Sequence, residues 1–235
     1  RSHHAEYFLS FLSRRYSAIT GPGQHETLRE IQDEFDNIHA AWLYTAKHGP
    51  YSTLSAGMPT LFRFLWLRGR YEDGRQLAAE ALAAVDEAGL APDDSRVRVA
   101  LMVYCAQFTA ILGSSDKALS QSQIALAAAE ELGAVAVRAH CHYVMGMAAA
   151  HLLEADRAEA DLWAAYNLYH ELNDALGIAE VALHLVYVKL IVKCEPQSCL
   201  ALVEEGLGLF RRLGDDANIA DALNSYAALS WATGK

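Results

Sequence analysis

The sequence predicts an all-α protein, a solenoid of about eleven antiparallel helices. Three observations predict it: segments recur at an interval of 40 to 41 residues, 53% of the 235 residues are hydrophobic, and only five prolines interrupt the chain. No run of β-branched residues reads as a strand. Stacked helix pairs share one hydrophobic core that runs along the stack, so a chain of this length does not need a single central core.

The repeat is visible in two sets of short segments. Residues 113–118 (GSSDKA) align with residues 153–158 (LEADRA), and the triplets 131–133, 171–173 and 212–214 align with one another. Each repeat is therefore predicted to be two amphipathic helices joined by turns. The predicted turns fall in two series, near Gly113, Leu153 or Lys193 and near Gly133, Asn173 or Gly214.

Small residues recur at positions where two helices must approach closely. They begin the second helix of each pair, recur seven residues later on the same face, and take one position in the first helices. The three sets are Gly74, Ala118, Ala158 and Cys199; Ala81, Ala125, Ala165 and Gly206; and Ala106, Gly146 and Ala227.

Two regions are predicted within one continuous domain. Residues 1–50 form an N-terminal helical segment, with helices at 7–19 and 26–47 separated by Gly21-Pro22-Gly23, which does not stay helical. Residues 51–235 form the repeat array, with about four full helix pairs and a longer exit from the first repeat at Pro92. The last helix, 216–233, is half a repeat, so we expect a fragment of a longer protein.

Composition narrows the function classes. The formal net charge is −10, so the chain lacks the basic footprint that nucleic-acid backbones require, and we expect no direct nucleic-acid partner. Residues 1–12 lack a long apolar stretch, and no signal peptide or membrane span is indicated. Four cysteines without paired CxxC spacing indicate a reducing, cytoplasmic compartment. Cys194 and Cys199 are predicted to be free thiols, with pairing under oxidation as the alternative.

The period and the small-residue pattern resemble the tetratricopeptide superfamily, in particular the longer-period form of MalT-like bacterial regulators. A more specific resemblance lies in Glu34-Phe-Asp-Asn-Ile-His-Ala-Ala-Trp42, followed by the stretch 61–71 (LFRFLWLRGRY). These segments are similar to the junction after the ATPase core in signal-transduction ATPases with numerous domains and in LuxR-type transcriptional regulators.

The resemblance implies a right-handed α-α superhelix that senses an effector or a regulatory protein. It also implies a parent protein with a nucleotide-binding domain and a winged helix on the N-terminal side and an output domain elsewhere. This chain has no GxxxxGK[ST] motif, so it does not carry the phosphate-binding loop itself.

The first helix of each pair lines the concave groove in such solenoids, so its inward positions are the candidate binding residues. They combine aromatic, amide and charged side chains, which suits recognition of a protein, a peptide or a small effector. The candidates are Arg63, Trp66, Gln107, His140, Tyr143, Met147, His151, Glu180, Tyr187 and Asn224, with Asp221 and Trp231 beside them. The alternative for each is a packing role on the inner wall.

The sequence offers no candidate for catalysis, a metal site or a cofactor. His140, Cys141 and His142 are adjacent, and neighbouring side chains on a helix point about 100° apart, so one ion does not reach all three. No nucleophile elbow or HExxH motif occurs. We therefore expect a non-enzymatic protein without a cofactor.

Three hypotheses about function follow. The first is a regulatory sensor domain whose groove captures an effector or peptide. The second is a purely structural scaffold that oligomerises through Leu223, Leu229 and Trp231 on the last helix. The third is a peptide-pheromone receptor, although such receptors begin with a helix-turn-helix that the first 50 residues do not show.

Overall fold

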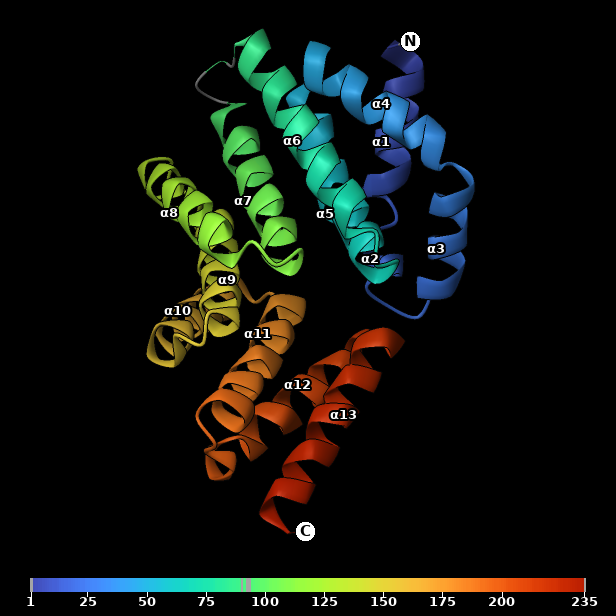
Figure 1. The fold of residues 1–235 in the computed structure, drawn as a ribbon. Helices are drawn as coiled ribbons and strands as arrows, with labels where there is room; N and C mark the ends of the chain where they lie inside the picture. Colours follow the sequence, from blue (N-terminus) through green and yellow to red (C-terminus); the bar gives the residue numbers. More distant parts are fainter. Residues whose placement is uncertain (1, 90, 92–93, 235) are drawn as a thin grey trace. The chain divides into compact units, whose positions relative to one another are not determined.

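The computed structural model describes residues 2–89, 91 and 94–234 (Figure 1). These residues form thirteen α-helices, one π-helical turn and one short 3₁₀ turn, and they contain no strand. The all-α prediction is confirmed. Pro92 and Asp93, which the sequence assigns to the break after the first repeat, lie outside the described residues, and the next helix begins at Ser95.

Packing divides the chain into two compact units, Arg1–Gly113 and Ser114–Lys235. The first unit contains α1 (Ser2–Ser13), α2 (Tyr16–Ile19), α3 (Gln24–Asp33), α4 (Phe35–His48), α5 (Tyr51–Leu67), α6 (Tyr71–Ala88) and α7 (Ser95–Ile111). Helix α1 packs on α4 and α5, and α4 packs on α6. The 1–50 segment thus shares its core with the helices that follow it.

The core of the first unit is aromatic. Trp42 of α4 is fully buried, and its indole Nε1 donates to the Leu77 carbonyl of α6 at 3.1 Å. Phe62 of α5 meets Trp42 edge-on, with ring centroids 5.5 Å apart, and stands 5.8 Å from Phe108 of α7. A buried indole needs such an acceptor because an unpaired N–H in the core costs free energy.

The number of helices exceeds the expected eleven because each of the two helices predicted before residue 50 is split. The first is interrupted after Ser13, where the Arg15 side chain lies 3.4 Å from the centre of the Phe11 ring and pairs with Glu30 at 2.7 Å. The second bends at Glu34. Buried residues keep helical spacing across that bend, from Ile31 to Ile38, so the sequence gives no signal for it.

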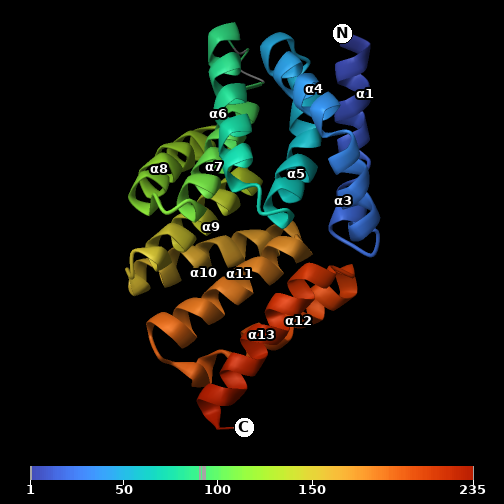
Figure 2. The same cartoon turned by 45° about the vertical axis from the view of Figure 1, so that its right-hand side comes forward.

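The second unit contains α8 (Ser115–Glu131), α9 (Val135–His151), α10 (Ala155–Leu172), α11 (Ala175–Tyr187), the π-helical turn η2 (Val188–Val192), the 3₁₀ turn η3 (Pro196–Ser198), α12 (Leu200–Leu213) and α13 (Asp216–Thr233). Each helix packs against the next one in the chain, from α8 to α13 (Figure 2). Helix α11 begins 40 residues after α9, and α13 begins 41 residues after α11.

Residues with left-handed backbone angles end the helices at the predicted intervals. One series is Gly69, Gly113, Leu153, Cys194 and Gly234, and the other is Gly89, Gly133, Asn173 and Gly214. The turn at Cys194 was predicted at Lys193, one residue earlier. Most of these ends share one hydrogen bond, from the amide after the left-handed residue to the carbonyl five positions back, as from Glu154 to Ala149 at 2.9 Å.

The predicted small residues lie between packed helices, except Ala227 of α13, which is exposed. Ala118, Ala158, Ala125 and Ala165 are fully buried. A Cβ atom on Gly146 of α9 would come within 2.6 Å of Leu162 Cγ on α10, a distance at which atoms clash. Helices α9 and α10 therefore approach as closely as they do because position 146 has no side chain.

One segment, Ala175–Val192, is long and apolar enough to cross a membrane, with a mean hydropathy of 1.9. The sequence did not indicate such a span, because the segment carries Glu180 and Lys189. It packs against α10 and α12, and half of it is buried in the protein.

Replacing Gly146 by alanine should lower the free energy of unfolding by about 1–3 kcal/mol, because the added methyl group overlaps Leu162. The matched control is Gly208→Ala on α12, where nothing lies within 4 Å of the added Cβ. There, helix propensity alone should raise stability by about 0.5–1 kcal/mol. Urea unfolding measures both, and equal stability of the two variants would contradict the close approach.

Candidate functional site

The predicted groove residues fall in both units. Arg63 and Trp66 lie on α5 and Gln107 on α7, in the first unit; the others lie on the second unit's α9, α11 and α13. Arg63 is buried, with 9% exposure, and Trp66 packs on Tyr71 and Phe108 at ring distances of 5.6 and 6.4 Å. Arg63 and Trp66 thus contribute to the core of the first unit.

The second unit brings three aromatic and imidazole side chains of α9 and α11 into contact. His140 and Tyr143 of α9 stack, with ring centroids 6.3 Å apart. Tyr143 meets His184 of α11 edge-on at 5.1 Å, and its hydroxyl lies 3.4 Å from His184 Nδ1. His151, on the same face of α9, lies 3.5 Å from the Ser115 hydroxyl. We call His140, Tyr143, His151, Glu180 and His184 the histidine face.

Helix geometry places these side chains together. Positions 140, 143, 147 and 151 follow helical spacing along one side of α9. On α11, Glu180 and His184 are four residues apart, and the Glu180 carbonyl lies 3.0 Å from His184 Nδ1. A carbonyl only accepts, so Nδ1 carries the hydrogen and donates to Glu180, which fixes the ring beside Tyr143.

Burial keeps two imidazoles of the histidine face, those of His140 and His184, neutral. It lowers the pKa of His140 to about 4, because little water is left to solvate a charged ring. Burial also lowers the pKa of His184; the Glu180 carbonyl opposes that shift, and a charge on His151 adds to it. At pH 7 the rings of His140 and His184 are therefore polar and uncharged.

Exposure differs among the predicted residues of the second unit. Tyr143 and Met147 are buried at 4% and 1%, whereas His140, Glu180 and His184 are half-buried and His151 is exposed. Only the last four offer surface to a ligand. Tyr187 is exposed and no contact with the face is found for it among the described residues, and Asn224, Asp221 and Trp231 are exposed on α13.

His184 was missed by the sequence analysis. The 40-residue interval makes Leu183 the equivalent of Tyr143 and Tyr187 the equivalent of Met147, so register selected Tyr187 and passed over His184. The helical rule that links residues four apart would have found His184 from Glu180. The lesson is that spacing within one helix locates a side chain better than the interval between repeats.

The adjacent residues His140, Cys141 and His142 point in different directions, as helix geometry requires. Cys141 is buried, which raises the pKa of its thiol to about 12, and His142 pairs with Asp161 of α10 at 2.9 Å. In the part of the chain that the structure describes, no group of three or more histidine, cysteine, aspartate or glutamate side chains is arranged to hold a metal ion.

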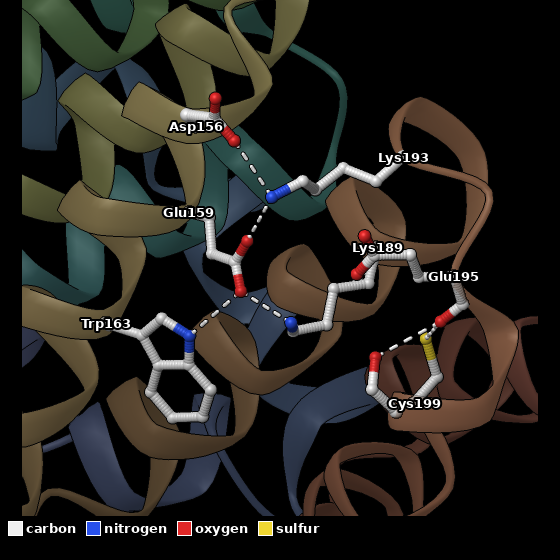
Figure 3. Close-up of polar contacts among 8 residues, drawn as sticks. Asp156, Glu159, Trp163, Lys189, Lys193, Glu195 and Cys199 are labelled. Atoms are coloured by element: carbon white, nitrogen blue, oxygen red, sulfur yellow. Dashed lines mark hydrogen bonds and ion pairs between the residues drawn. The ribbon is translucent and has the colours of Figure 1, made fainter.

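A second polar cluster joins α10 to the π-helical turn (Figure 3). The Glu159 carboxylate accepts from Lys189 Nζ at 2.5 Å, from Lys193 Nζ at 2.7 Å and from Trp163 Nε1 at 3.4 Å. Lys193 also pairs with Asp156 at 2.9 Å. The two lysines lower the pKa of Glu159 to about 2, and the carboxylates raise the pKa of Lys193.

The π-helical turn has a cause in the repeat length. Leu153 and Cys194, the equivalent left-handed residues, are 41 residues apart, although their helices begin 40 apart. The extra residue widens one turn, where Lys193 N donates to the Val188 carbonyl five positions back. At this helix end the amide of Glu195, which follows the left-handed residue, donates to the carbonyl of Lys189, six positions back rather than five.

The cysteines beside this turn are free. Cys194 is exposed, and Cys199 is fully buried with its thiol 3.6 Å from the Glu195 carbonyl. Burial raises the pKa of the Cys199 thiol, so it stays protonated and unreactive.

No protein-family model matches the chain, and no curated protein matches it either. Among solved structures, it is similar to the crystal structure of BtubC (BKLC) from P. vanneervenii, with a TM-score of 0.59 and 18% identity. The match covers 96% of this chain and 84% of that one. At this identity the likeness shows the fold alone.

Protonation of His140 should destabilise the protein in mild acid. The folded state holds the pKa of His140 near 4 and the unfolded chain has the ordinary value of 6.5. The stability that neutral His140 contributes is therefore complete above pH 6.5 and declines as pH falls towards 4. In His140→Gln, the urea midpoint should fall less over this range. Ala136→Gln, one turn away and exposed, controls for the glutamine, and identical pH slopes in all three proteins would contradict the prediction.

The Glu159 cluster should stabilise the protein until strongly acidic pH. Its pKa is lowered from 4.5 to about 2, so its contribution is complete above pH 4.5 and is lost as pH falls through 2. Glu159→Gln should lower the unfolding free energy by about 0.5–1 kcal/mol at pH 7, as expected for a partly solvated ion pair. Guanidinium unfolding at pH 7 and pH 2 measures this difference, which should vanish at the lower pH. An equal loss in Glu171→Gln, exposed on the same helix, would show that the pairing is irrelevant.

Proposed function

We propose that the chain is a non-catalytic, tetratricopeptide-like binding domain: a right-handed α-α superhelix that senses a ligand or partner within a cytoplasmic bacterial regulatory ATPase or transcriptional regulator. The left-handed helix ends at intervals of 40 to 44 residues support the repeat architecture. The likeness to a solved structure over 96% of the chain supports the fold.

The histidine face is the observation that carries the binding proposal. It offers half-exposed rings for stacking and a carboxylate, Glu180, at its edge. The rings of His140 and His184 are uncharged at pH 7, no lysine or arginine occurs in α11 or α13, and α13 carries the acid Asp221. Such a surface favours a neutral or cationic ligand with aromatic or apolar groups and repels an anionic one.

The same geometry supports a binding role over a catalytic one. His151 contacts the Ser115 hydroxyl, which is the first half of a nucleophile–base pair. Among the contacts of the described residues, His151 has no carboxylate partner to orient it and complete a triad.

A structural scaffold that mediates oligomerisation is the second candidate, and the exposed apolar side chains of α13 favour it. The sequence assigned Leu229 to this surface, but Leu229 is buried at 4%, on the side that packs within the unit. A charge at 229 would unfold α13, so it does not test assembly. Leu223, at 45% exposure, and Trp231, at 86%, are the surface residues.

Peptide titration tests the binding proposal. An aromatic-rich peptide of net positive charge should bind, and the same sequence with glutamate in place of each lysine should not. Glu180→Gln and His140→Ala should each weaken binding by roughly tenfold, about 1.4 kcal/mol. Both positions are half-buried, so the fold tolerates the changes better than at buried Arg63 or Tyr143.

Calorimetry measures the affinity, with Glu171→Gln as the control for loss of one acid elsewhere on the second unit. Native mass spectrometry of the untreated protein reports any ligand that it retains. Equal binding of both peptides, or unchanged affinity in Glu180→Gln and His140→Ala, would refute the histidine face as the site.

A further inference from the structure

The connection that leads into α12 differs from the three equivalent connections before it. In those, the second helix of the pair begins two residues after the left-handed residue: Tyr71 after Gly69, Ser115 after Gly113 and Ala155 after Leu153. After Cys194, α12 begins only at Leu200, six residues later. The residues between them form the 3₁₀ turn η3 and are mostly exposed. This connection is therefore not held within an α-helix as the others are.

A thiol stands at each end of this connection. Cys194 has a left-handed backbone, with a φ of 58°, at a position where most equivalent residues are glycine. Cys199 stands where the earlier repeats have a small residue, which is Gly74, Ala118 or Ala158. Both cysteines thus depart from the residue that the repeat favours, and they do so in the same connection.

The Cys199 thiol is turned back towards the start of the connection (Figure 3). Its Sγ lies 3.6 Å from the carbonyl oxygen of Glu195, the residue that follows Cys194. In a helical connection the equivalent carbonyl accepts from a backbone amide, as Glu154 O accepts from Ala158 N at 2.9 Å. At Glu195 the backbone donor is Ser198 N, at 3.4 Å. Contacts of this length hold the segment less firmly than an α-helical turn does.

The two thiols differ in their access to solvent. Cys194 is exposed, whereas Cys199 is fully buried, and burial raises the pKa of its thiol. A dissolved oxidant therefore reaches Cys194 first, and Cys199 is shielded until residues 195–198 move. An accessible cysteine that reacts first, with a second cysteine near it in the chain, is the arrangement found at reversible thiol sites.

We propose that Cys194 and Cys199 form a site of reversible oxidation by hydrogen peroxide or an organic hydroperoxide, which closes an intramolecular disulfide across the connection. The inference goes beyond the proposed binding function and is independent of it, because the site shares no residue with the histidine face.

The chemistry has two steps. The Cys194 thiolate attacks the peroxide O–O bond and becomes a sulfenic acid, and the leaving oxygen takes up the proton that the Cys194 thiol released, as water or an alcohol. The Cys199 sulfur then attacks the Cys194 sulfur, and the displaced hydroxide leaves with the Cys199 proton as water. The two sulfurs give up two electrons, which reduce the peroxide.

Mass spectrometry tests the site. The reduced full chain is treated with a stoichiometric amount of hydrogen peroxide, unfolded, alkylated with iodoacetamide and digested with trypsin. Residues 194–211 form one tryptic peptide that contains both cysteines, because it is bounded by Lys193 and Arg211. This peptide should lose two hydrogen atoms and take up no iodoacetamide, and dithiothreitol should reverse the change. Cys105 and Cys141 are buried and should be alkylated in full.

Two variants separate the roles of the thiols. In Cys199→Ala, which introduces the residue found at the equivalent positions 118 and 158, Cys194 should stop at the sulfenic acid and be labelled by dimedone. In Cys194→Ser, Cys199 should remain a thiol at the same peroxide dose, because it is buried. The wild-type chain should take up no dimedone, since the disulfide forms instead.

A transplanted pair controls for spacing. In a Cys194→Ser, Cys199→Ala background, Leu153→Cys and Ala158→Cys place two thiols at the same spacing, again after a left-handed residue, but α10 begins between them at Ala155. This pair should stay reduced at the peroxide dose that closes the native one. Circular dichroism checks that each variant is folded.

Every outcome bears on the proposal. Loss of two hydrogen atoms confined to the 194–211 peptide, with dimedone labelling only in Cys199→Ala, would establish the site. Oxidation of Cys105 or Cys141 at the same dose would show that the reaction is unselective and would overturn it. Dimedone labelling or an intermolecular disulfide at Cys194 in the wild-type chain, or equal closure of the transplanted pair, would do the same. None of these results alters the test of the histidine face, which is peptide binding.

Discussion

The second unit depends on how its helices end. Each helix must reverse direction within two or three residues, and its last carbonyls must still find donors. A left-handed residue followed by an amide that bonds five positions back meets both needs, as at Leu153 and Glu154 or at Asn173 and Asp174. Leucine at the first of these positions costs roughly 1 kcal/mol relative to glycine, so the packing of the adjoining helices must offset that strain.

Regular helix ends make the register of the helices regular. Small residues can then recur at fixed positions, and Gly146 meets Leu162 only because α9 and α10 start in the correct phase. The histidine face follows from the same register, since α9 and α11 present equivalent sides next to each other. Burial between these helices holds the rings of His140 and His184 uncharged, so the absence of charge on which the proposed ligand class rests is a result of close packing.

The repeat could be predicted because its signals are local. A glycine or asparagine at a turn, and an alanine where two helices touch, can each be recognised from a few neighbouring residues. The bend at Glu34 was not predictable, because the buried positions keep helical spacing through it. Arg63 was assigned to a groove by register, yet it is buried in the first unit, and the register of the repeats does not reveal which positions are buried. His184, by contrast, could have been predicted, because it lies four residues after Glu180 and therefore on the same side of the helix.

The π-helical turn has a further consequence, for how the chain tolerates changes in length. One residue added to an unbroken α-helix rotates everything after it by about 100° and exchanges buried sides for exposed ones. Here the extra residue is confined to Val188–Val192, where Glu159 holds Lys189 and Lys193 from outside the helix, and Gly206 of α12 still meets α11 in register. The chain thus contains a point at which one extra residue is absorbed locally, so the order of buried and exposed sides in the later helices is preserved.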